Sequence, residues 1–150
     1  MPTILGQLTR ATNILGHHLE ERIVETGLYV TEYLVLRTAA SDPEATTADV
    51  RRSLALRHAA FSDVVRRSVA RGYARVIPAP RDRRTQLLTL TLPGAQAVRI
   101  AEDIHRDLEG YLGAPIRQLE AFEFIHALGG RLSMIPAATL LSDGLPLATA

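Results

Sequence analysis

The stretch that decides the fold is 54–94, which reads LALRHAAFSDVVRRSVARGYARVIPAPRDRRTQLLTLTLPG. In its first half apolar and polar residues alternate at helical spacing. Arg71-Gly72 ends this helix, because glycine adopts a left-handed cap without steric cost. Two extended runs follow, separated by Pro78, Pro80 and a cluster of arginines. Because proline cannot donate to a strand ladder and like charges repel, we expect this loop to project into solvent.

Charge is unevenly distributed along the chain. Ten of the seventeen basic residues, but only two of the sixteen acidic ones, fall between Arg51 and Arg84, although the net charge is +1. Such asymmetry is typical of a surface that binds a polyanion, carried on an otherwise acidic body. A solvated, Arg-rich helix with a charged loop is the simpler alternative. A winged helix-turn-helix, whose helix enters a DNA groove while its hairpin grips the flank, accounts for both basic segments.

The run 82–94, DRRTQLLTLTLPG, carries a family resemblance. It matches the wing pattern of MarR-family transcriptional regulators, D-x-R followed by L-x-L-T-x-x-G. Leu54–Leu56, Val64–Arg67 and Arg71–Tyr73 fit the recognition helix of that family in spacing. The chain thus resembles a MarR-family regulator over about 31–135.

Three departures from the family pattern concern the helix-turn-helix. Ala55 replaces the usual turn glycine, and Arg51 stands where a small residue normally packs. Arg57–Ala60 replaces a helix start rich in Ser, Pro and Thr. We expect these departures to change which DNA sequence is read rather than whether DNA is bound.

The resemblance implies a mainly α fold with a small β-hairpin wing, in which N- and C-terminal helices form a dimerisation region. It assigns 1–30 and 92–135 to dimerisation helices, 31–91 to the winged helix-turn-helix DNA-binding region, and 136–150 to a tail. Hydrophobic periodicity predicts helices at about 3–25, 31–40, 48–54 and 91–112, and a last one that ends near 135.

The terminal helices carry more apolar surface than one small lobe can cover, so we expect a homodimer. Its recognition helices would lie about one DNA turn apart, roughly 34 Å, and face a pseudo-palindromic operator in double-stranded DNA.

The side chains expected to contact DNA lie on the recognition helix and on the wing tip. They are Arg57, His58, Ser62, Arg66 and Arg67, and then Arg81, Asp82, Arg83 and Arg84. We expect the helix start to meet base edges, and Arg66 and Arg67 to touch phosphate. The resemblance implies that a wing arginine enters the minor groove, and Asp82 can pair with Arg84 to hold the tip. The core positions of this helix are predicted to be Phe61, Val64, Val65 and Val69.

The resemblance also implies a small aromatic or anionic ligand in a crevice between the first, second and fifth helices. His18, Tyr33 and Arg37 could border this crevice, although Tyr33 fits equally well as a core residue. A cluster of potential metal ligands lies nearby in the sequence, namely His17, His18, Glu20 and Glu21, with His105 further on. It lacks the i, i+4 histidine pair of zinc motifs, so a solvated helix end is the preferred interpretation, and neither metal nor cofactor is expected.

Other classes of protein are excluded by what the sequence lacks. It has no cysteine, so disulfides and thiolate redox sensing are absent. It has no Gly-rich phosphate loop, nucleophile elbow or catalytic carboxylate arrangement, so we do not expect an enzyme. With no membrane-spanning run and no signal peptide, a cytoplasmic protein without membrane contact is expected.

The sequence therefore predicts a homodimeric, sequence-specific DNA-binding transcription regulator. In the resembling family such a protein is most often a repressor that a small ligand relieves. The alternative is a winged-helix protein-interaction module that no longer binds operator DNA.

Overall fold

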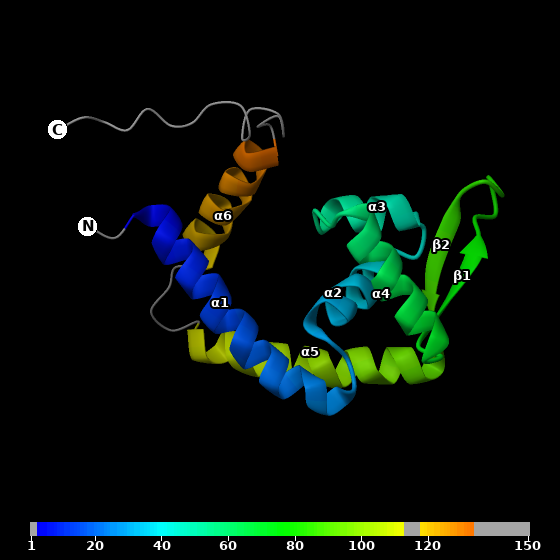
Figure 1. Cartoon of the computed structure of the whole chain (residues 1–150), viewed down its shortest axis with the longest axis horizontal. Coiled ribbons are helices and arrows are strands. Elements are labelled where there is room, and N and C mark those ends of the chain that lie inside the picture. Colours follow the sequence, from blue (N-terminus) through cyan, green and yellow to red (C-terminus); the bar gives the residue numbers. More distant parts are fainter. Residues whose placement is uncertain (1–2, 113–117, 134–150) are drawn as a thin grey trace. The chain divides into compact units, whose positions relative to one another are not determined.

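The computed structural model of the chain describes residues 3–112 and 118–133, and the predicted tail 136–150 lies outside them (Figure 1). In chain order its elements are α1 (Ile4–Ile23), the 3-10 helix η1 (Val24–Thr26), α2 (Val30–Ser41), α3 (Thr47–Ser53), α4 (His58–Ala70), β1 (Ala74–Pro78), β2 (Gln86–Leu90), α5 (Leu92–Leu112) and α6 (Gln118–Ser133). The chain divides into two compact units, 1–107 and 108–150. The first unit contains α1 to α4, the hairpin and most of α5.

The first helix carries an apolar stripe that its own unit covers only at one end. Thr3 caps the helix by accepting a hydrogen bond from the backbone N–H of Gly6 at 3.1 Å. Ile23 is the single buried residue of α1, whereas Ile4 is 73% exposed. A left-handed Gly27, with φ of +79°, then separates η1 from α2.

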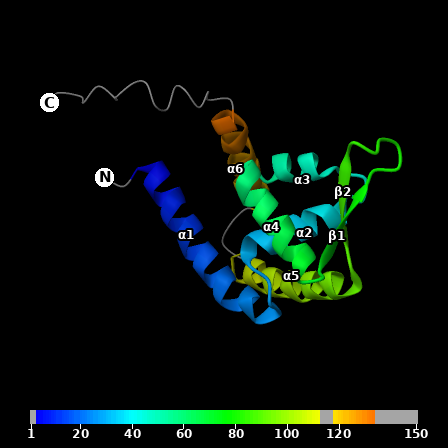
Figure 2. The same ribbon diagram turned by 45° about the vertical axis from the view of Figure 1, so that its right-hand side comes forward.

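The core of the first unit is built around α2, which lies beside α4 and along α5 in both views (Figures 1 and 2). Tyr33 and Leu36 are both at most 1% exposed. They belong to one apolar cluster with Phe61 and Val64 of α4 and with residues of the hairpin and of α5. Because α2 contacts each of these elements, it fixes where α4 and the hairpin stand.

The turn between α3 and α4 is closed by contacts that explain two departures from the family pattern. Ala55 occupies the left-handed region, with φ of +51°, which is the conformation that a glycine would adopt without strain. The Arg51 guanidinium donates to the carbonyl oxygen of Leu56 at 3.2 Å. Arg51 therefore spans the turn where a smaller residue would leave that carbonyl without this donor.

The two strands form an antiparallel hairpin whose register runs from Ala74 opposite Leu90 to Pro78 opposite Gln86. Leu87 of β2 also bridges to Thr46, just before α3, and so ties the hairpin to the helix-turn-helix. A helix-turn-helix followed by this hairpin is a winged helix-turn-helix, as the sequence predicts.

One core prediction on α4 is wrong. Val69 is 41% exposed, because it lies beyond the stripe that meets α2.

No helix in 3–112 or 118–133 is both long enough and apolar enough to cross a lipid bilayer.

Candidate nucleic-acid interface

The outer face of α4 presents a line of polar side chains one helical turn apart. Arg57 is the N-cap of the helix, and His58, Ser62 and Arg66 follow at i, i+4 spacing, all exposed. The His58 Nδ1 lies 3.4 Å from the Ser62 hydroxyl. Arg66 donates to Asp63 at 2.6 Å while 79% of its side chain stays exposed. These exposed side chains can therefore enter a groove of DNA without disturbing the core of the protein.

These helix residues converge with the hairpin on one open groove of about 630 Å³. His58, Ser62 and Arg66 line one part of it, and Val76 and Gln86 of the hairpin line another. Three of the predicted DNA contacts thus share one concave surface, and the hairpin supplies the opposite wall.

Arg67, another predicted contact, lies apart from this groove. It is half-buried, and its guanidinium carbon lies 4.6 Å from the centroid of the Tyr29 ring. Its Nε is buried and has no hydrogen-bond partner within the part of the chain that the structure describes. Arg67 is thus directed at the start of α2.

The loop that joins the strands is shaped by Asp82. One carboxylate oxygen accepts from the backbone N–H of Arg84 at 3.0 Å, and the other accepts from the Thr85 hydroxyl at 2.9 Å. The backbone bond from Arg84, followed by the Thr85 bond, lowers the pKa of Asp82 below its usual value of 3.8. Asp82 does pair with Arg84, as predicted, but through the backbone, so the Arg84 guanidinium stays available.

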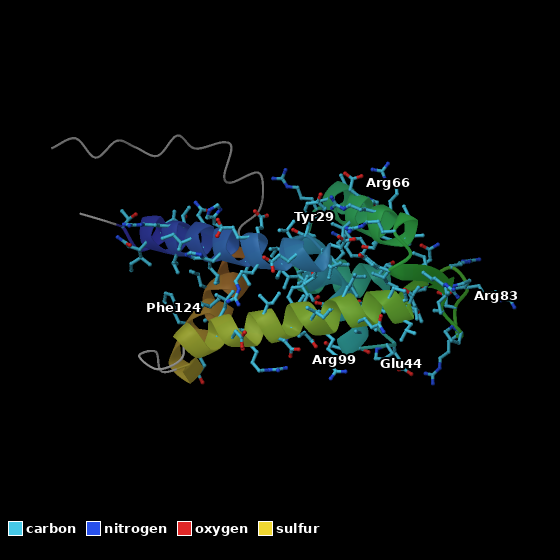
Figure 3. The ribbon with its side chains drawn as sticks, turned by 90° about the horizontal axis from the view of Figure 1, so that it is seen from below. Tyr29, Glu44, Arg66, Arg83, Arg99 and Phe124 are labelled. Atoms are coloured by element: carbon cyan, nitrogen blue, oxygen red, sulfur yellow. The ribbon has the colours of Figure 1, made fainter. Side chains whose placement is uncertain are left out.

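The arginines of the loop extend outward. Arg81, Arg83 and Arg84 are exposed, and among the described residues none of their guanidinium groups meets a carboxylate. Figure 3 shows Arg83 at the hairpin and Arg66 at α4, both reaching away from the ribbon. Unpaired guanidinium groups on a projecting loop attract phosphate, because each offers a planar fork of donors.

Two of the three predicted ligand-binding residues face α5. Tyr33 is 1% exposed, and its hydroxyl lies 3.1 Å from Nδ1 of His105 on α5. One turn further along α2, Arg37 forms an ion pair with Glu102 of α5 at 3.4 Å. His18 is exposed on α1, 3.9 Å from Glu21 of the same helix. The burial of Tyr33 agrees with its alternative interpretation as a core residue.

The histidine and glutamate cluster of α1 forms ion pairs within that helix. His17 lies 3.2 Å from Glu21. Over the ranges that the structure describes, no three potential ligands come close enough together to hold a metal ion.

Sequence analysis does not predict a group of polar contacts between α4 and α2. Glu32 of α2 is fully buried and accepts hydrogen bonds from Ser68 and from Arg71, the residue that caps the end of α4. Helical spacing could have revealed it, because Ser68 and Arg71 follow Phe61 and Val64 on the buried stripe. Arg71 is exposed, but its guanidinium binds Glu32 and Gly27 within the lobe while it adds to the basic charge of the segment.

The helix-turn-helix and the hairpin that follows it define the class of structure as a winged helix. No protein-family model matches the sequence, and no curated relative matches it. Solved structures do match. A MarR/EmrR family transcriptional regulator from Acinetobacter has a TM-score of 0.77 at 20% identity, over 87% of this chain and 95% of that chain.

Two further structures show such folds with bound partners. The complex of MepR from S. aureus with DNA has a TM-score of 0.76 at 14% identity, covering 87% of this chain and 95% of that one. CouR from Rhodococcus jostii, bound to p-coumaroyl-CoA, has a TM-score of 0.75 at 23% identity, covering 83% and 88%. At these identities the likeness confirms the predicted fold class: this chain has the winged-helix fold of MarR-family regulators. Several of the structures it matches are described as transcriptional regulators.

Proposed function

We propose that this chain is a MarR-family transcription regulator that binds double-stranded DNA in a sequence-specific way. The observation that carries the proposal is the groove between α4 and the hairpin, where His58, Ser62 and Arg66 converge beside a loop of unpaired arginines. Arg57 and His58 read base edges, and Arg66 binds phosphate. Arg81, Arg83 and Arg84 grip the flank, and one of them enters the minor groove.

The regulator acts as a homodimer. The helices of 1–30 and 92–135 form the dimer interface, and 31–91 binds a pseudo-palindromic operator. Exposed apolar side chains on three of these helices support the arrangement. They are Ile4, Leu5, Ile14 and Leu15 on α1, Ile100 on α5, and Phe124 and Ile125 on α6, each at least 40% exposed in the single chain. Large apolar side chains left open in this number favour burial against a second copy.

The regulator acts as a repressor that a small ligand releases from DNA. The crystal structure of CouR holds p-coumaroyl-CoA, and that of PcaV from Streptomyces coelicolor holds its natural ligand. The candidate border of a ligand site in this chain is His18, Tyr33 and Arg37, for an aromatic or anionic molecule. A repressor that binds chromosomal DNA would act in the cytoplasm.

The test is a selection of duplexes from a random pool by the full-length protein, followed by a salt titration on the enriched sequence. We expect enrichment of a pseudo-palindrome and an affinity that falls with a slope of about 0.9 per phosphate contact in log K against log salt. No enrichment, or a flat salt response, would favour the alternative function, a winged-helix module that binds another protein instead of an operator.

A further inference from the structure

The inner side of α4 is joined to the start of α2 through a buried carboxylate. Glu32 is fully buried although it is acidic. One of its oxygens accepts from the Ser68 hydroxyl at 2.8 Å. The other accepts from the Arg71 guanidinium at 3.1 Å and from the backbone N–H of Tyr29 at 3.4 Å. A buried charge is tolerated only when it is paired and hydrogen-bonded. Loss of any one of these partners should therefore disturb the positions of the others.

Arg71 extends the same connection to the junction between η1 and α2. Its second guanidinium nitrogen donates to the carbonyl oxygen of Gly27, and the guanidinium carbon lies 4.9 Å from the centroid of the Tyr73 ring. A Cβ at residue 27 would meet the Tyr73 hydroxyl at 3.1 Å and the Arg71 guanidinium at 3.2 Å. One planar side chain therefore links the α1–α2 junction, the end of α4 and the residue that leads into β1.

A second contact lies one helical turn earlier on α4. The guanidinium of Arg67 stacks on Tyr29, the N-cap residue of α2. Figure 3 shows Tyr29 between α1 and α4, away from the labelled Arg83 of the hairpin. The inner polar face of α4 is thus occupied by the segment 27–32, which is joined to α1 through η1.

We propose that Glu32 and Arg71 are positioning residues that fix the angle between α1 and the recognition helix α4. The consequence for DNA rests on the proposed function: with α1 in the dimer interface, this angle sets the spacing of the two recognition helices. DNA accepts a spacing near one turn, roughly 34 Å, so a change in the angle lowers affinity without removing a phosphate contact. Arg71 is a basic residue of the DNA-binding region that does not touch DNA.

The angle is tested through the distance between α1 and α4, measured on the full-length protein without DNA. The chain has no cysteine, so Asn13→Cys on α1 and Ala60→Cys on α4, both exposed, give two specific spin-label sites. Labelled protein is mixed with an excess of unlabelled protein, so that distances within one chain dominate. We expect one narrow distance distribution, and a shift or broadening when Arg71→Lys or Glu32→Gln is added. Lysine keeps the charge but lacks the planar fork that reaches Glu32 and Gly27 together.

The matched control is Arg66→Lys, the same change on the outer face of α4, which should leave the distribution unaltered. If Glu32 and Arg71 act through each other, the double variant should show no more change than the larger single one. Thermal unfolding identifies any variant that fails to fold. If Arg71→Lys or Glu32→Gln fails to fold, it is replaced by Ser68→Ala, which removes one donor to Glu32. This variant should still broaden the distance distribution.

The DNA measurement separates positioning from contact. We expect Arg71→Lys and Glu32→Gln to lower affinity by roughly tenfold with an unchanged salt slope. An unchanged distance distribution would overturn the proposal, and so would a slope reduced by about 0.9 in Arg71→Gln, which removes the charge. If the unmodified protein binds no DNA, the proposed function fails, while the distance measurement still decides whether this pair positions α4.

Discussion

Gly94 lies so close to Tyr73 that a Cβ at residue 94 would come within 1.9 Å of the Tyr73 carbonyl oxygen. The same carbonyl accepts from the backbone N–H of Thr91 at 3.0 Å, and the Thr91 hydroxyl donates to the carbonyl of Gly72 at 2.6 Å. The threonine and glycine of the wing pattern therefore form a joint between the two ends of the hairpin and the start of α5.

Gly94→Ala should destabilise the protein by about 3 kcal/mol, because the clash is with backbone and cannot be relieved by a rotamer change. Urea unfolding at fixed protein concentration measures the change in free energy. Gly110→Ala is the control. Nothing lies within 4 Å of a Cβ there, so this helix position should become slightly more stable. Similar unfolding free energies for the two variants would contradict the close contact.

Ala55→Gly should stabilise the protein by roughly 0.5–1 kcal/mol. The left-handed φ of +51° costs an alanine about 1–2 kcal/mol, more than the entropy that a glycine adds to the unfolded chain. Ala55 is exposed, so no packing is lost. The control, Ala60→Gly in the exposed part of α4, should be destabilising by about 1 kcal/mol. A loss of stability in both variants, measured by urea unfolding, would argue against strain at Ala55.

Arg84→Ala and Arg57→Ala should weaken DNA binding in different ways. Arg84 lies on the exposed tip, so its loss should lower affinity across many sequences and reduce the salt slope by about 0.9. Arg57 begins the recognition helix, so its loss should relax preference at one base, worth about 1–3 kcal/mol of discrimination. Selections from random duplexes with both variants make the comparison, and the same outcome for both would reject this division between base and backbone contacts.

Much of the fold was predictable because its signals are local. Helical spacing placed α1 to α5 within a few residues of their observed bounds, and Pro78 with the arginine loop placed the hairpin. The exposed residues of the candidate interface also follow from position, since the start of α4 and the loop tip face solvent in any winged helix-turn-helix.

The pairing of Glu32 with Arg71 could not be predicted in the same way, although helical spacing indicates which side of α4 Arg71 occupies. Glu32 and Arg71 are far apart in the sequence, and nothing near either residue indicates its partner. By charge alone, Arg67 and Arg71 belong to the basic surface, because charge does not say which side of a helix an arginine occupies. Helical spacing does indicate the side: Arg71 follows Phe61 and Val64 at helical spacing, so its side chain lies on the side of α4 that faces Glu32.

The turn at the wing tip should lose its structure only in acid. The hydrogen bonds from Arg84 and Thr85 favour the ionised form of Asp82, so its pKa is lower in the folded protein than in the unfolded chain. The stability that these bonds supply is therefore fully present above pH 3.8, the usual value, and is lost as pH falls through the lowered pKa. Carboxyl NMR should give a midpoint below 3.8 for Asp82, with amide protection of Arg84 and Thr85 lost over the same range. Thr85→Val removes only the second donor, so it should raise the midpoint part of the way. A midpoint at or above the usual value in the unmodified protein would show that Asp82 does not hold this turn.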